Sequence, residues 1–225
     1  MDNAKMAVIL LGGGTSRRFG CLKQYTSILG KPLFIHTIKS FINFPVVLVM
    51  PENTHLLARE NLNYFKISNK VYLVKEGSSR QESVKNGLSY LCNSAINKVI
   101  ISEVARPCLT KQTIKDFSQK LKNESCLLAV TKSTNTTCFE IEGKLDKLVP
   151  RKNMYDLLMP QGFDFNKIYA AHCNTKINNA TDDSVLFLEK HLSNQISLFS
   201  ISKHEGFKVT YPSDALIVEK LLEAK

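Results

Sequence analysis

Short apolar runs alternate with helix-like segments along most of this chain, and this alternation restricts its fold more than any other feature. The apolar runs are typical of buried strands, and they cover 6–11, 46–50, 71–74, 98–102, 126–130 and 196–201. The segments between them carry helical periodicity or capping residues, and they cover 31–43, 52–65, 78–91, 110–121, 165–176, 181–192 and 212–225. The pattern predicts an α/β fold with a mostly parallel twisted sheet and helices on both faces.

The segment 131–163 interrupts the alternation. It is polar, rich in β-branched residues and rich in turn formers, with a turn expected at Glu142–Gly143. It therefore predicts short strands that leave the sheet as an arm or hairpin. Because no repeat or low-complexity linker divides the rest, residues 1–225 are predicted to form a single domain with this arm as an insertion.

Composition narrows the choice of partners and compartment. Thirty Lys and Arg residues against 20 Asp and Glu give a formal net charge of +10, which either favours anionic ligands or is only a solvated surface. Six widely spaced cysteines form no CxxC pair, so we expect mostly buried thiols in a reducing cytoplasm. The apolar run 6–11 is too short for a signal sequence, and no segment reaches the roughly 20 apolar residues of a membrane span.

The stretch LLGGGTSRRFGCLKQ, residues 10–24, follows the first predicted strand. It does not fit a Walker A loop, because its last glycine is not followed by Lys and Ser or Thr. It does not fit the dinucleotide fingerprint, because Arg17 stands at the third glycine position. Two interpretations remain: a glycine-rich turn with incidental arginines, or a loop whose amides face a polyphosphate together with Arg18 and Lys23.

A second polar cluster follows the third predicted strand. Gly77, Arg80 and Ser83 stand where that strand ends and a helix begins. Hydroxyl groups and helix amides at such a place can contact the polar edge of a base, or they can simply cap the helix. In a parallel sheet, ligands bind beyond the carboxyl ends of the strands, which is where this cluster and the glycine loop both lie.

Two more candidates occur later in the chain. Glu103 directly follows a buried strand and precedes Arg106, so this pair either binds a metal, ribose hydroxyls or a phosphate, or forms a surface ion pair. Lys208 is expected in a short strand before the last helix and means little alone. The histidines have no ligand spacing, and His36 and His172 fall in predicted helices, where a structural role is expected.

Together these motifs resemble those of the 2-C-methyl-D-erythritol 4-phosphate cytidylyltransferases of the non-mevalonate isoprenoid pathway, to which the ribitol-5-phosphate cytidylyltransferases are close relatives. The motifs are, in chain order, LGGGTSRRF, LKQY, GKP, RQESV, SEVARP, MPQGF, TDDS and KVTYPSD, and they span nearly the whole chain. The resemblance implies a Rossmann-like nucleotidyltransferase domain. It also implies that 131–163 is a protruding β-arm for dimerisation, and hence a homodimer.

The resemblance further implies transfer of CMP from CTP to a polyol phosphate, with release of pyrophosphate. Residues expected to wrap the CTP phosphates are Gly12, Gly13, Gly14, Thr15 and Ser16. Those expected to stabilise charge at the reacting phosphorus, with Mg²⁺, are Arg18, Lys23 and Lys208. No general base is required, because the attacking phosphate is already ionised.

The remaining implied contacts divide between nucleotide and acceptor. Gly77, Arg80 and Ser83 would line the cytosine and ribose pocket. The polyol phosphate would meet Glu103 and Arg106, together with two arm residues supplied by the partner subunit, Thr134 and Arg151. Glu103 is also the expected ligand of Mg²⁺.

The chain departs from the family pattern mainly on the polyol side. Ser102-Glu103 replaces His-Asp, Met159 replaces the threonine of the TPQ motif, and Ser16 replaces a loop glycine. The first expectation is therefore 2-C-methyl-D-erythritol 4-phosphate as acceptor, and the alternative is ribitol 5-phosphate or another polyol phosphate. A non-catalytic nucleotide- or RNA-binding protein is a remote alternative, since two lysines directed at one phosphorus serve catalysis and no aromatic-rich strand of the RNA-recognition type is present. Nucleic acid and membranes are not expected partners.

Overall fold

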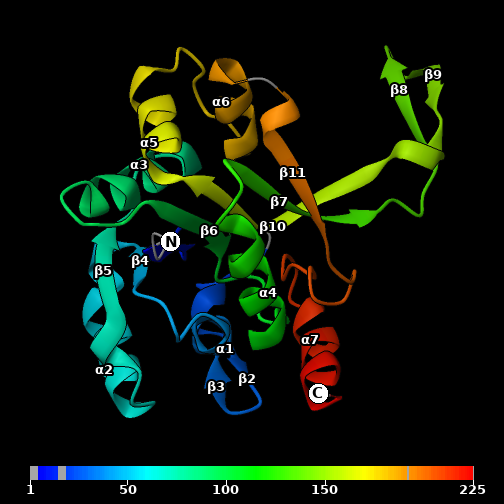
Figure 1. Cartoon of the computed structure of the whole chain (residues 1–225). Helices are drawn as coiled ribbons and strands as arrows, with labels where there is room; N and C mark the ends of the chain where they lie inside the picture. The colour runs from blue at the N-terminus through cyan, green and yellow to red at the C-terminus, as the bar shows by residue number, and fades with distance from the viewer. Residues whose placement is uncertain (1–4, 15–18, 192, 225) are drawn as a thin grey trace.

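A computed structural model describes residues 5–14, 19–191 and 193–224 (Figure 1). In this part of the chain, seven strands form one sheet in the order β11–β7–β10–β6–β1–β4–β5. They are β1 (Met6–Leu11), β4 (Val46–Met50), β5 (Val71–Lys75), β6 (Lys98–Glu103), β7 (Cys126–Lys132), β10 (Tyr155–Asp164) and β11 (Ile196–Ser200). Only β10 runs antiparallel to its neighbours in this sheet, so the prediction of a mostly parallel sheet is confirmed.

Helices cover both faces of the sheet, as predicted. The helices whose side chains join the core on one face are α1 (Leu33–Ser40), α2 (His55–Tyr64) and α4 (Lys111–Leu121). Those on the other face are α3 (Arg80–Leu91), α5 (Phe165–Asn174) and α6 (Asp183–Lys190). A smaller third cluster surrounds α7 (Asp214–Glu223), which carries the C-terminal end at the bottom of Figure 1.

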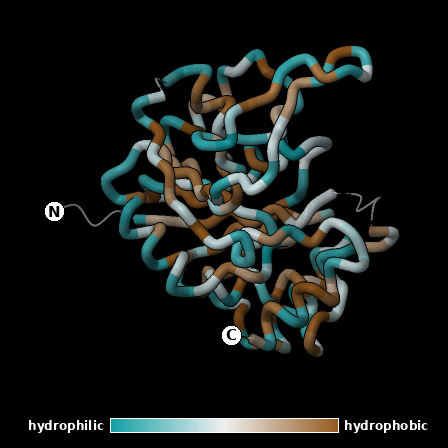
Figure 2. Tube along the Cα trace, turned by 90° about the vertical axis from the view of Figure 1, so that its right-hand side faces the viewer, coloured by the Kyte–Doolittle hydropathy of each residue, from teal (hydrophilic) through white to brown (hydrophobic). Residues whose placement is uncertain are grey.

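The composition of β1 shows why a strand between two helix layers is apolar throughout. Val8 and Leu10 belong to the core on one face, and Ala7 and Ile9 belong to the core on the other; all four are fully buried. Successive residues of a strand point to opposite faces, so a strand covered on both sides has no polar position. Figure 2 shows the resulting concentration of hydrophobic segments in the middle of the molecule.

Several element boundaries differ from the predictions. The helix expected over 31–43 begins only at Leu33, because β3 (Lys31–Pro32) pairs with β2 (Ser27–Ile28) in a short hairpin. The short strand expected around Lys208 does not form, and residues 207–210 are irregular. This segment is instead tied down by a backbone hydrogen bond of 2.8 Å from Val209 to the carbonyl oxygen of Ala105.

The predicted arm exists but is shorter than expected. β8 (Thr137–Ile141) and β9 (Lys144–Val149) form a hairpin that projects from the body at the upper right of Figure 1. Its turn falls at Glu142–Gly143, as predicted. Residues 155–163, however, belong to β10 in the centre of the sheet, and the pairing of β10 with β7 shifts between Leu157 and Gln161.

The expectation that most cysteines are buried is wrong. Cys108 and Cys126 are buried, and the four other thiols are exposed. Proximity to apolar runs misled the prediction, because several of these cysteines stand at helix ends or on the arm. None of the six takes part in a disulfide bond. None of the helices in the described ranges combines the length and the hydropathy needed to cross a bilayer.

A close approach between β10 and α4 provides a test of the packing. A Cβ atom at Gly162 would lie 2.6 and 2.8 Å from two methyl carbons of Leu121 and 2.9 Å from the ring of Phe117. We therefore expect Gly162→Ala to lower the free energy of unfolding by about 1–3 kcal/mol through overpacking, measured by urea denaturation. In the Gly162→Ala/Leu121→Ala double variant the two losses should be less than additive, and strict additivity would contradict the explanation.

Candidate active site

A cavity of about 610 Å³ opens at the carboxyl ends of β1, β5 and β6. β1 lies between β4 and β6, so successive crossovers leave it in opposite directions and create the crevice in which α/β sheets bind ligands. Of the predicted site residues that the structure describes, those that line this cavity are Gly13, Gly14, Lys23, Gly77, Arg80, Ser83, Glu103 and Lys208.

The glycine loop begins as a continuation of β1. The Gly12 amide donates to the Val49 carbonyl at 2.8 Å, and the chain then turns at Gly14, whose φ is +99°. The Gly14 amide donates to a carboxylate oxygen of Glu76 at 2.8 Å. A Cβ at Gly13 would lie 2.1 Å from that same oxygen, so only glycine permits this approach.

Sequence reasoning missed Glu76, although an acidic residue directly after the third strand was a visible signal. Its carboxylate shows that the Gly14 amide is oriented to receive an anion. Three predicted loop residues, Thr15, Ser16 and Arg18, lie outside the described residues, so their roles stay predictions.

The start of α3 forms the opposite wall. The Ser79 hydroxyl accepts from the Glu82 amide at 3.1 Å and caps the helix. The Ser83 hydroxyl accepts from the Gly77 amide at 3.0 Å and donates to the Ser79 carbonyl at 2.9 Å. Ser83 thus locks the end of β5 onto the first turn of α3. The stretch caps the helix and also lines the cavity, and contact with a base stays a prediction.

Lys23 and Lys208 meet at the cavity from opposite ends of the chain. Lys23 starts a short 3₁₀ turn (Lys23–Tyr25), and its ammonium group donates to the Val209 carbonyl at 3.3 Å. Lys208 is the residue before Val209, and its Nζ atom lies 2.6 Å from a carboxylate oxygen of Glu103. The irregular segment 207–210 therefore holds one lysine and anchors the other.

The Glu103 carboxylate is surrounded by the cations of this site. Besides Lys208, the Arg106 Nε atom lies 3.6 Å from the carboxylate and the Arg80 Nε atom lies 3.9 Å from it. Burial alone would raise the pKa of Glu103, but Lys208, Arg106 and Arg80 outweigh it and hold that pKa below the usual carboxyl value. Glu103 is thus a carboxylate that draws three cations of the described chain together.

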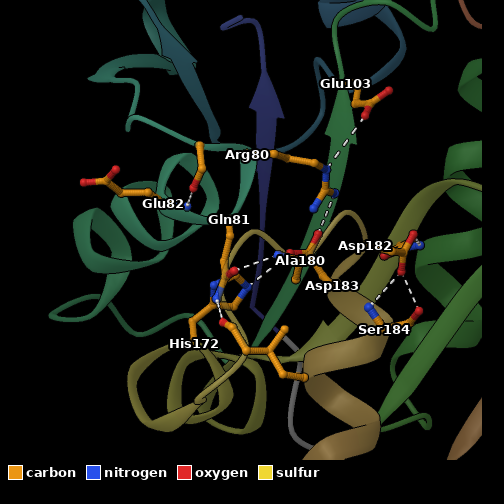
Figure 3. Close-up of polar contacts among 12 residues, drawn as sticks. Arg80, Gln81, Glu82, Glu103, His172, Ala180, Asp182, Asp183 and Ser184 are labelled. Atoms are coloured by element: carbon orange, nitrogen blue, oxygen red, sulfur yellow. Dashed lines mark hydrogen bonds and ion pairs between the residues drawn. The ribbon is translucent and has the colours of Figure 1, made fainter.

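A buried carboxylate on the other side of Arg80 extends this cluster (Figure 3). The Asp183 side chain lies 2.7 Å from Arg80 Nη2, and its second oxygen lies 3.1 Å from His172 Nε2. The expected structural role of His172 agrees with this contact. Sequence reasoning noticed the TDDS motif but assigned no role to Asp183.

Other predicted residues lie elsewhere in the single chain. Arg106 does not line the cavity; its guanidinium donates to the Gly206 carbonyl. Thr134 and Arg151 line a separate cavity of about 530 Å³ at the base of the arm, where Arg151 donates to the Thr134 carbonyl at 3.0 Å. Met159 is buried and lines neither cavity. Contacts of Arg106, Thr134 and Arg151 with the acceptor therefore stay predictions.

Within the described ranges, no group of three or more His, Cys, Asp or Glu side chains forms a ready-made metal site. Glu103 offers a single carboxylate beside a loop suited to phosphates. Mg²⁺ is commonly held by one or two carboxylates plus the phosphates of its ligand. The donor set therefore fits a cation that binds together with a phosphate-bearing ligand.

The fold and this cavity define a nucleotide-binding α/β enzyme in which a glycine loop faces a cluster of cations. The family model described as IspD, 2-C-methyl-D-erythritol 4-phosphate cytidylyltransferase, matches residues 6–224. The chain belongs to this family and is a nucleotidyltransferase.

Individual relatives agree with this assignment. The cytidylyltransferase of that name from Dehalococcoides mccartyi (strain ATCC BAA-2266 / KCTC 15142 / 195) is 31% identical over 227 residues, covering 98% of this chain and 97% of the relative. The one from Aquifex aeolicus is 30% identical over 222 residues, covering 95% and 96%. The crystal structure of 4-diphosphocytidyl-2C-methyl-D-erythritol synthase from Anaerococcus prevotii superposes with a TM-score of 0.86 at 20% identity, covering 99% and 97%, which shows the shared fold.

The charge cluster around Glu103 predicts a pH-dependent stability. Glu103→Gln leaves three cations around a neutral amide, so we expect a loss of about 3 kcal/mol in the free energy of unfolding at neutral pH. Because the folded pKa of Glu103 is lowered, its contribution is present above the unfolded pKa of about 4.3 and disappears as pH falls through the folded value. The gap between wild type and variant should therefore shrink below about pH 4.

Urea denaturation at a series of pH values measures this gap. The matched control is Glu60→Gln on the exposed face of α2, which should change stability little at any pH. A gap for Glu103→Gln that persists undiminished at the lowest pH would show that the carboxylate acts by packing and not by charge.

Proposed function

We propose that this chain transfers CMP from CTP to 2-C-methyl-D-erythritol 4-phosphate and releases pyrophosphate. The observation that carries the proposal is the convergence of Lys23 and Lys208, from opposite ends of the chain, on a cavity walled by the glycine loop and the start of α3. The names of the relatives supply the acceptor, since each is a 2-C-methyl-D-erythritol 4-phosphate cytidylyltransferase.

The proposed reaction is an in-line displacement. A phosphate oxygen of the acceptor attacks the α-phosphorus of CTP, the new P–O bond forms, and the bond to the bridging oxygen of pyrophosphate breaks. Lys23 and Lys208, with Arg18, stabilise the charge that develops on the α-phosphate. The resting contact of Lys208 with Glu103 keeps its ammonium group at the cavity, from which it exchanges a carboxylate oxygen for a phosphate oxygen.

Mg²⁺ is part of this proposal. It would neutralise the triphosphate and orient its oxygens, with Glu103 as the protein carboxylate that holds it. Three cationic side chains of the described cavity wall, Lys23, Arg80 and Lys208, stand against two carboxylates, Glu76 and Glu103. This small excess of positive charge suits a strongly anionic ligand that binds together with its own counterion.

The active enzyme is proposed to be a homodimer. Four arm side chains expose more than half of their surface, namely Phe139, Ile141, Leu145 and Leu148, and exposed apolar groups gathered on one projecting hairpin favour association. Dimerisation would carry Thr134 and Arg151 to the partner's cavity to bind the acceptor phosphate. We further place the enzyme in the cytoplasm, a reducing compartment that suits six cysteines without a disulfide bond.

The decisive experiment measures pyrophosphate release by the purified protein with CTP and Mg²⁺. Release should require a polyol phosphate, and 2-C-methyl-D-erythritol 4-phosphate should give a higher kcat/KM than ribitol 5-phosphate. UTP and ATP serve as nucleotide controls. Absence of release with every acceptor of such a panel would refute the proposed function, and a preference for ribitol 5-phosphate would refute only the choice of acceptor.

Complementation between inactive subunits tests the dimeric site. Lys208→Ala and Arg151→Ala should each lower turnover more than tenfold, because each removes a charge that contacts a phosphate. Co-expressed, the two variants form mixed dimers in which one site has both defects and the other has none. Statistical mixing should restore about a quarter of the wild-type sites.

The control is co-expression of Lys208→Ala with itself under a second affinity tag, which should restore nothing. No recovery in purified mixed dimers would show that Arg151 acts in its own subunit. Light scattering of the wild type should give the mass of a dimer, and a stable, active monomer would contradict the trans arrangement.

A further inference from the structure

Arg80 reaches the cavity with part of its guanidinium committed and part without a partner. Its Nη2 atom is bonded to Asp183 at 2.7 Å. Its Nε and Nη1 atoms are buried and have no hydrogen-bond partner among the described residues, and a carboxylate oxygen of Glu103 lies 3.9 Å from Nε. Buried donors without acceptors are costly, so these nitrogens are arranged for an acceptor that arrives with a ligand.

The acid that holds Arg80 is completely buried. Asp183 is 1% exposed and its second oxygen is held by His172 Nε2 at 3.1 Å, on a ring that is itself buried. Since an ionised carboxylate only accepts hydrogen bonds, His172 donates here. A buried ion pair contributes little net stability compared with apolar side chains of similar size, so stability alone does not account for this group.

Three further hydrogen bonds fix Asp183 relative to Arg80, two of them made by Gln81 (Figure 3). The Gln81 side chain, next to Arg80 at the start of α3, donates to the Ile177 carbonyl at 2.9 Å and accepts from the Ala180 amide at 2.8 Å. These bonds clamp the segment before α6 onto the start of α3. Asp182, the cap of α6, is bonded to Gln161 of β10 at 2.8 Å. The first turn of α6 is therefore held in place by both α3 and β10.

We propose that Asp183, supported by His172, is a positioning residue for nucleotide binding: it holds one nitrogen of Arg80 so that the other two face the cavity. The inference rests on the proposed function in that the ligand is CTP, whose oxygens supply the missing acceptors. Without Asp183, Arg80 turns toward Glu103, where it competes with Lys208, and its orientation for the nucleotide is lost.

The test makes the same conservative change at Asp183 and at an exposed carboxylate on the opposite face of the sheet. Asp183→Asn should raise the Kd and the KM for CTP about tenfold, which is the effect of losing one charge-assisted hydrogen bond, while kcat falls less than about threefold. The control is Asp116→Asn, an exposed carboxylate on α4, which packs on the other face of the sheet from α3 and α6, and it should stay within about twofold of wild type. Calorimetry gives the Kd for CTP, and thermal unfolding confirms the fold.

A double-mutant cycle separates positioning from a general structural role. If Asp183 acts through Arg80, then Asp183→Asn should leave the Kd for CTP unchanged in an Arg80→Ala background. An equal rise in Kd in both backgrounds would overturn the proposal, as would wild-type affinity in Asp183→Asn itself. Should Asp183→Asn fail to fold, the same cycle is carried out with His172→Asn. This variant should raise the Kd for CTP about threefold, and the rise should disappear in the Arg80→Ala background.

The outcome is distinguishable from failure of the proposed function. If the wild type does not bind CTP, the proposed function fails and with it the ligand of this inference. If the wild type binds and turns over CTP while Asp183→Asn binds it equally well, only the positioning role of Asp183 is refuted.

Discussion

The Glu103 carboxylate is the interaction on which the site depends. A cavity for a triphosphate needs several cations within a few ångströms of one another, and such cations repel in a partly buried place. Glu103 at the end of β6 offsets that repulsion by accepting Lys208 at 2.6 Å while Arg106 and Arg80 lie at 3.6 and 3.9 Å. Its position follows from the sheet, where it is paired with Leu11 beside the glycine loop.

Two acids, Glu103 and Asp183, thus hold the cations of the site in place. Glu103 belongs to the cavity wall, whereas Asp183 lies behind it and is closed off from solvent. Arg80 connects them, since it contacts both carboxylates. Burial alone would raise the pKa of Asp183, but Arg80 and His172 outweigh it and hold that pKa below the usual value, so the acid remains charged where it is needed.

Much of this arrangement could be predicted from sequence, and the reasons are local. β1 and β4 are apolar at every position because both faces are covered, which makes them visible as short runs. The central strand β10 was not recognised, because Met159, Pro160 and Gly162 resemble a loop, and its antiparallel place between β6 and β7 depends on contacts distant in sequence.

The charge pairs could not be predicted from the sequence either, because their members are also distant along the chain. Lys208 and Glu103, like Asp183 and Arg80, are separated by about a hundred residues, and nothing in the local pattern of either member indicates the other. Three of the predicted cations, Lys23, Arg80 and Lys208, line one cavity, since motifs at strand ends of a parallel sheet meet there. The motif order did not reveal which acids hold them in place.

The way the arm joins the sheet has a consequence for engineering. The Ser133 amide donates to the Met154 carbonyl at 3.0 Å, so the two ends of the hairpin leave the body at one point. Beyond that point β10 pairs with β7, beginning at Tyr155 and Lys132. The hairpin therefore has adjacent ends, and cuts at residues 133 and 154 allow it to be removed or exchanged for the hairpin of a relative. A cut at residue 163 would instead remove a strand from the middle of the sheet.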